Sequence, residues 1–107
     1  MTISSDLAEQ VGLRPYERIL VSNMGNGERF ETYVIYGKPG TGTIELNGAT
    51  AHLGKIGDRL TIMNFGFFTP EEADEHKPRV LVLNEHNHVV RYEGPEVVES
   101  NLEVASR

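Results

Sequence analysis

The sequence predicts one small, mainly β domain, a mostly antiparallel or mixed β-barrel with two short helices. Short runs rich in β-branched and aromatic residues alternate with turn dipeptides and Gly-rich loops. The chain shows neither an internal repeat nor the strict strand–helix alternation of parallel α/β folds. Its 107 residues can form one hydrophobic core but not two. Closing the short strands into a barrel would remove their exposed edges.

Each expected element has a local signature. The elements are a helix at residues 5–11, strands at 18–23, 29–36, 43–46 and 59–65, a helix at 70–76, and strands at 79–83 and 88–92. The first helix follows cap-type serines and ends before Gly12 and Pro15. The first two strands flank a Gly-Asn-Gly turn and predict a hairpin.

The loop at residues 37–42 contains one Lys and several Gly residues, as phosphate-binding loops do. Its Lys comes first and no helix follows, so we interpret it as a hairpin loop. Asn47-Gly48 is interpreted as a turn after the third strand, and Gly57-Asp58 as a turn before the fourth.

The second helix has the clearest start in the chain. Thr69 is a typical N-cap, Pro70 occupies the first helical position, and Glu72 completes a capping box. The acidic run that follows is expected to be the solvated face of this helix. The last two strands flank a polar turn and predict a final hairpin.

Composition excludes several classes of function. Lys and Arg number 10 against 16 Asp and Glu, a net charge of −6, which disfavours nucleic acid as a partner. The chain has no Cys, hence no disulfide, thiolate nucleophile or Cys-based metal site. His86 and His88 are expected to lie in a solvated turn, so no metal site is predicted. With no signal peptide or membrane-spanning run, we expect a soluble, cytoplasmic protein without membrane partners.

The strand that begins at Arg29 carries candidate functional residues. Strand alternation places Arg29, Glu31 and Tyr33 on one face and Phe30 and Thr32 on the other. Arg can bind a carboxylate with two hydrogen bonds, and Tyr can donate a proton. The residue types alone favour an ordinary hairpin with a polar outer face.

Two motifs lie in linked positions, residues 26–33 (NGERFETY) and residues 47–52 (NGATAH). They resemble the Asn-Gly-x-Arg-Phe-x-Thr-Tyr and Asn-Gly-Ala-Ala-Ala-His segments of the pyruvoyl-dependent aspartate 1-decarboxylases. Gly57-Asp58 and the Lys-Pro at 77–78 follow at matching positions. The resemblance runs from Met1 to about Tyr92 without a gap.

The resemblance implies a six-stranded double-psi β-barrel over residues 1–92, the processed large chain of the enzyme. A separate short chain from the same precursor would supply the first strand and a Lys that contacts substrate. The implied assembly is a homotetramer with active sites between neighbours. Residues 93–107 would remain outside the barrel as an acidic C-terminal tail, which is expected to be flexible.

The resemblance also implies a cofactor and a reaction. In the family, a precursor cuts itself at a Gly-Ser bond, and the serine becomes an N-terminal pyruvoyl group. Here that residue is expected immediately before Met1. The implied reaction decarboxylates L-aspartate to β-alanine and CO₂ through a Schiff base with the pyruvoyl group, for pantothenate and coenzyme A biosynthesis.

Residue roles are implied one by one. Arg29 would bind a substrate carboxylate, and Tyr33 would donate the proton. Thr32 would assist self-cleavage and lie beside the pyruvoyl group and substrate, while Asn47 would orient the cofactor carbonyl or imine. The substrate pocket would be lined by Gly48, Ala49 and Thr50. Because Thr32 and Tyr33 alternate, both can serve one site only if the strand is distorted or the site lies at a subunit boundary.

Alternatives remain open at this point. The sequence could be the processed large chain, a polypeptide started at Met1, or a homologue that lost the cofactor. A catalytically inactive barrel that binds a small carboxylate or a protein partner is a second class of function. Thr50 stands where the family usually has Ala, which leaves open a related acidic amino acid as substrate.

Overall fold

The computed structural model describes residues 1–95, which are mainly β, so the predicted fold class is confirmed. Its elements are β1 (Thr2–Ser4), α1 (Ser5–Gln10), β2 (Arg18–Asn23), β3 (Arg29–Tyr33), β4 (Ile35–Gly37), β5 (Ile44–Glu45), the 3₁₀ helix η1 (Gly48–Leu53), β6 (Leu60–Met63), α2 (Pro70–Glu75), β7 (Val80–Leu83) and β8 (Val89–Glu93). Most of the expected flexible tail, residues 96–107, lies outside the described residues.

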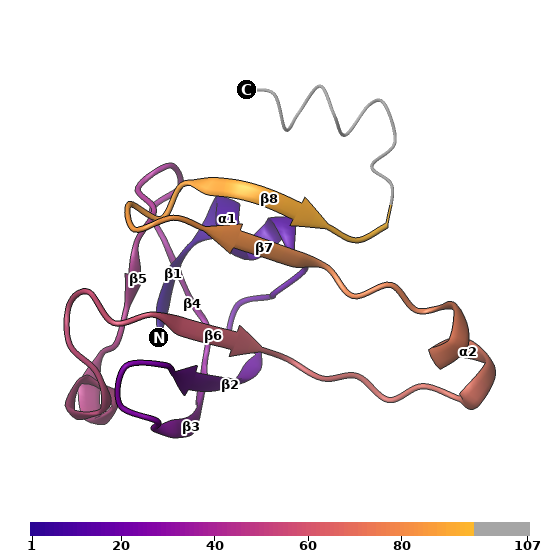
Figure 1. The fold of residues 1–107 in the computed structure, drawn as a ribbon, viewed down its shortest axis with the longest axis horizontal. Helices are drawn as coiled ribbons and strands as arrows, with labels where there is room; N and C mark the ends of the chain where they lie inside the picture. The colour runs from indigo at the N-terminus through magenta and orange to yellow at the C-terminus, as the bar shows by residue number, and fades with distance from the viewer. Residues whose placement is uncertain (96–107) are drawn as a thin grey trace.

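The strands form three small sheets (Figure 1). In one sheet β1 lies between β4 and β5, parallel to the first and antiparallel to the second. In another, β2 lies between β3 and β6, with both pairs antiparallel. The third is the hairpin β7–β8, whose register is irregular between Val82 and Leu83. Both predicted hairpins, β2–β3 and β7–β8, are confirmed.

The expected strand at residues 29–36 is divided in the structure, which corrects the prediction. Val34 is fully buried between β3 and β4. Its N–H donates to Glu17 O at 3.0 Å and its carbonyl accepts from Tyr16 N at 2.7 Å. One residue later, Ile35 N donates to Met1 O at 2.8 Å. The chain therefore leaves β2 and joins β1 at this point, so one β-forming run supplies strands to two sheets.

Two turn predictions are also corrected. The loop at residues 37–42 does not close a hairpin, because β4 and β5 both pair with β1 and not with each other. Asn47-Gly48 is not a simple turn, because the helix η1 begins here. This helix was not predicted from the sequence, since its residues are mostly small and show no clear hydrophobic pattern. Gly48 has a φ of +59°, a backbone conformation that favours glycine at this helix start.

The predicted start of the second helix is confirmed in detail. Glu72 N donates to Thr69 Oγ1 at 3.2 Å, and Thr69 N donates to Glu72 Oε1 at 3.0 Å. Figure 1 shows α2 at the end of an arm that extends away from the sheets. Residues 64–80 of this arm are all exposed, Phe65 and Phe67 among them. No helix within residues 1–95 is long and apolar enough to cross a membrane.

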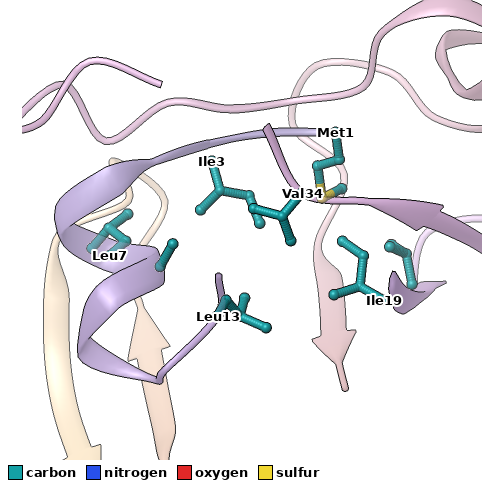
Figure 2. Close-up of a cluster of buried hydrophobic side chains, with 8 residues drawn as sticks. Met1, Ile3, Leu7, Leu13, Ile19 and Val34 are labelled. Atoms are coloured by element: carbon teal, nitrogen blue, oxygen red, sulfur yellow. The ribbon is translucent and has the colours of Figure 1, made fainter. Parts of the chain in front are cut away.

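The hydrophobic core lies between the start of the chain, α1 and β2. Figure 2 shows Leu7 of α1 at one end of the cluster and Ile19 of β2 at the other, with Ile3 and Val34 between them. The buried apolar residues are Met1, Ile3, Leu7, Ala8, Leu13, Ile19, Val21 and Val34. Burying them is the main favourable contribution to folding, and it fixes the position of the first residue, Met1.

A polar contact ties the β2–β3 turn to the segment after η1. Asn23 is 2% exposed, and its Nδ2 donates to Leu53 O at 3.1 Å and to Asp58 Oδ2 at 2.9 Å. Gly25 N donates to Asn23 Oδ1 at 2.8 Å, and Lys55 N donates to Asp58 Oδ2 at 2.9 Å. The hydrogen bonds from Asn23 and from the Lys55 backbone hold the pKa of Asp58 below its ordinary value of 3.8.

Replacing Ile19 by Ala tests the core. Ile19 is 1% exposed, and we expect Ile19→Ala to lower the free energy of unfolding by about 2–4 kcal/mol through lost burial and a residual cavity. The matched control is Ile56→Ala, since Ile56 is 105% exposed and its loss is expected to change stability by less than about 0.5 kcal/mol. Urea unfolding at one fixed protein concentration measures both. Equal losses for the two variants would contradict this assignment of the core.

Replacing Asp58 by Asn tests the polar contact through its pH dependence. Because the pKa of Asp58 is lower in the folded than in the unfolded chain, its ionised form stabilises the fold above pH 3.8, and this stabilisation is lost as the pH falls. We therefore expect Asp58→Asn to be less stable than the parent at neutral pH, and the difference to narrow in acid. Urea midpoints across pH measure this, with Asp74→Asn on the exposed α2 as control. A difference that is independent of pH would contradict the account.

Candidate active site

Strand β3 presents the predicted site residues on its two faces. Its register with β2 runs residue for residue from Arg18 opposite Tyr33 to Ser22 opposite Arg29, without a bulge. Arg29 and Tyr33 are exposed, Tyr33 by 51%. Thr32 is half-buried on the opposite face, paired with the buried Ile19. The predicted alternation along this strand is confirmed, and the strand is not distorted to bring Thr32 and Tyr33 to one side.

The beginning of the chain lies beside the end of β3. Met1 N donates to Tyr33 O at 2.9 Å, and Met1 O accepts from Ile35 N. Because Met1 is 2% exposed, its position is set by core packing as well as by these two hydrogen bonds. The structure thus brings the first residue and the predicted proton donor's backbone into direct contact.

Asn47 lies at the junction between β5 and η1, across from β1. Its Nδ2 donates to Thr2 Oγ1 and to Glu45 Oε1, each at 3.0 Å. Thr50 Oγ1 donates to Asn47 O at 2.7 Å. The hydroxyl that distinguishes Thr50 from the usual Ala therefore closes the first turn of η1. Gly48 and Ala49, at the start of the same turn, are exposed.

The structure brings some predicted residues together and leaves others apart. The start of the chain contacts Tyr33, and Thr2 contacts Asn47. Arg29 and Tyr33 stand at opposite ends of β3, about 13 Å apart at roughly 3.3 Å per residue. Two surface hollows in the described part of the chain are lined by other residues. One is lined by Asp6, Leu7, Gln10, Gly40, Thr41, Gly42, Asn87, His88 and Val89, and the other by Gly25, Asn26, His52, Gly54, Lys55 and Asp58.

The sequence reasoning missed the polar residues that hold the site segments in place. Asn23 and Asp58 connect the turn before Arg29 to the end of η1. Thr2 and Glu45 hold the Asn47 amide. A strand-ending Asn and an Asp after Gly are ordinary turn signals, so nothing local marked these contacts. All of them except Glu45–Asn47 join residues 30 or more positions apart. Among residues 1–95, no three His, Asp or Glu side chains cluster to hold a metal ion.

Known proteins match this chain over most of its length. The sequence model described as aspartate decarboxylase matches residues 1–90. The aspartate 1-decarboxylase of Desulfotalea psychrophila is 53% identical over 87 residues, which cover 81% of this chain and 73% of that protein. Those of Listeria welshimeri and Cellvibrio japonicus are each 47% identical over 89 residues, covering 83% of this chain and 70% and 71% of theirs. The double-psi β-barrel expected from the resemblance is this family's fold. The chain belongs to the aspartate decarboxylase family.

Proposed function

We propose that this chain is the large chain of a pyruvoyl-dependent aspartate 1-decarboxylase, which forms β-alanine and CO₂ from L-aspartate for pantothenate biosynthesis in the cytoplasm. The observation that carries the proposal is the contact of Met1 N with Tyr33 O at 2.9 Å. Met1 N, to which we expect the pyruvoyl residue to be attached, lies beside the strand that carries Tyr33 and Thr32. The relatives of this chain bear this enzyme's name, which supports the proposal.

The residues at the start of the chain fit a pyruvoyl group on Met1. An amide nitrogen at Met1 would keep one N–H, which suffices for the hydrogen bond to Tyr33 O. Met1 is held in the core by its side chain and through its carbonyl, so a group attached to it would be rigidly positioned. When bound, the pyruvoyl group would supply an electrophilic ketone for the substrate amine and an electron sink for the pair that stays at Cα when CO₂ leaves.

The chain's own residues then have distinct tasks. The planar guanidinium of Arg29 binds a carboxylate of aspartate and fixes both its position and its charge. The bond from Cα to the departing carboxylate breaks, and the phenol of Tyr33 delivers a proton to Cα and later regains one from water. Thr32 would assist the self-cleavage of a precursor, whose other product would be the short chain.

Asn47 and the first turn of η1 form the part of the pocket where close approach of substrate is needed. Gly48 and Ala49 are small and exposed, so their backbone is accessible. The Thr50 hydroxyl already donates to Asn47 O. It therefore offers no free hydroxyl hydrogen to a substrate.

The arrangement on β3 supports a site shared between neighbouring chains of a homotetramer. Arg29 and Tyr33 lie at opposite ends of the strand, and the regular register keeps Thr32 and Tyr33 on opposite faces. Of the two earlier possibilities, a distorted strand and a subunit boundary, the geometry favours the second. Arg29 of one chain would then bind the substrate whose Cα is protonated by Tyr33 of its neighbour.

Mixing two variants, each impaired in a different residue, tests both the reaction and the shared site. We expect Arg29→Ala to raise KM at least about tenfold through loss of the carboxylate contact, and Tyr33→Phe to lower kcat about 100-fold or more through loss of the proton donor. At aspartate concentrations well below the parent KM, co-expressed chains should recover about one quarter of the parent activity, because random mixing leaves that share of sites with both residues. Release of β-alanine from L-aspartate is the measurement.

The matched control mixes Arg29→Ala chains with chains carrying both substitutions, which should give no recovery. Size-exclusion chromatography checks that the mixed chains assemble. If mixed assemblies form but are no more active than the two variants measured separately, the shared site is wrong. If the parent protein itself yields no β-alanine, the proposed reaction is wrong.

A further inference from the structure

Glu45 is placed to control the orientation of the Asn47 side chain. In the antiparallel pair β1–β5, Thr2 lies opposite Glu45, and Asn47 follows two positions later, on the same side of the chain. The three side chains therefore meet at one point. Asn47 Nδ2 lies 3.0 Å from Glu45 Oε1 and 3.0 Å from Thr2 Oγ1.

The chemistry of a carboxylate determines which way the amide faces. An ionised Glu accepts hydrogen bonds and cannot donate, so only the Asn47 nitrogen, not its oxygen, can face Glu45. The second N–H of Asn47 is directed to Thr2 Oγ1. Both amide hydrogens are thus used. Within residues 1–95, no donor forms a hydrogen bond with Asn47 Oδ1. This oxygen is therefore the atom of the amide that can accept a hydrogen bond from a substrate.

We propose that Glu45 is a positioning residue, whose carboxylate fixes the Asn47 amide so that Asn47 presents an acceptor to the amino group of the substrate. The inference rests on the proposed function and deepens it. It assigns Asn47 to N–H groups on the substrate nitrogen. Of the two partners expected for Asn47, the cofactor carbonyl and the imine, this excludes the carbonyl, which would need a free amide donor. Thr2 contributes the second restraint on the same nitrogen.

The surroundings of Glu45 allow its effect on the Asn47 amide to be distinguished from a contribution to fold stability. Glu45 is exposed, and its charge has no Lys or Arg partner within 4.0 Å among residues 1–95. Its removal should therefore leave the fold intact. Its effect should be seen on the Asn47 amide and on turnover.

The test uses Glu45→Ala and the conservative Glu45→Gln, whose side-chain oxygen can still accept from Asn47. We expect Glu45→Ala to lower kcat about tenfold with KM changed less than about twofold, the loss expected for one hydrogen bond to a charged group. Glu45→Gln should recover at least about half of the parent kcat. The control is Glu28→Ala, which makes the same change of charge in the exposed β2–β3 turn. Its kcat and KM should equal those of the parent.

A readout independent of activity is the NMR signal of the Asn47 side-chain amide in ¹⁵N-labelled protein, assigned by its absence in Asn47→Asp. Glu45→Ala should shift this signal and speed its exchange with water. The amide of Asn26, which donates to Leu53 O at 3.0 Å, should stay unchanged.

The outcomes separate this inference from the function on which it rests. An unchanged Asn47 signal in Glu45→Ala, or full kcat in that variant, would overturn the role of Glu45. A tenfold loss in Glu45→Gln as well would assign the effect to charge and overturn the hydrogen-bond account. A parent protein that makes no β-alanine would overturn the proposed function, while the NMR signal would still report whether Glu45 holds the amide.

Discussion

The exchange of hydrogen-bond partners at Tyr33–Ile35 is the constraint on which the rest of the structure depends. Up to Tyr33 the chain pairs with β2, and from Ile35 it pairs with β1. Val34 is fully buried between the two, with both of its backbone polar groups bonded to the segment before β2. Because buried backbone groups must be paired, this crossing joins two sheets at one point and draws Met1 against Tyr33. The start of the chain is thereby placed beside the strand that carries the candidate catalytic residues.

Around this crossing, the site is built on polar anchors that lie next to exposed functional groups. Arg29 and Tyr33 are exposed, whereas Asn23, which ties the turn before Arg29 to the end of η1, is buried. Anchoring the segments through buried hydrogen bonds leaves the functional side chains free to meet a substrate or a neighbouring chain. In a chain of net charge −6, an exposed Arg at a strand end is also well suited to attract a dicarboxylate.

Most of the local structure could be predicted from the sequence, because its signals are local. The capping box at Thr69, the Gly-rich turn between β2 and β3, and the alternation that separates Thr32 from Tyr33 each depend on neighbouring residues. The break at Val34 could not be predicted, since residues on both sides are equally β-forming and only the tertiary partners change. For the same reason the loop at residues 37–42 was wrongly assigned to a hairpin, as β1 lies between the two strands that it connects.

The site residues were found through the motifs at residues 26–33 and 47–52, whereas their supports were not. Thr2 and Glu45 reach Asn47, and Asn23 reaches Asp58, through contacts that only the folded chain creates. Once the order of the strands in the sheet is known, the register of β1 with β5 places Thr2 opposite Glu45. That register indicates the contacts of Thr2 and Glu45 with Asn47. Sequence patterns thus indicate which residues react, while the fold determines what holds them.

The measurement that tests the account most directly is the intact mass of the denatured protein, purified after expression of its complete gene. The account predicts two polypeptides, a short one and a large one whose N-terminus bears a pyruvoyl group ahead of Met1 and has no free amine. Reduction with borohydride in the presence of L-aspartate should increase the mass of the large polypeptide alone, by the mass of the bound amine less one oxygen atom. A single uncut chain, or a large chain with a free amine at its N-terminus, would contradict the account.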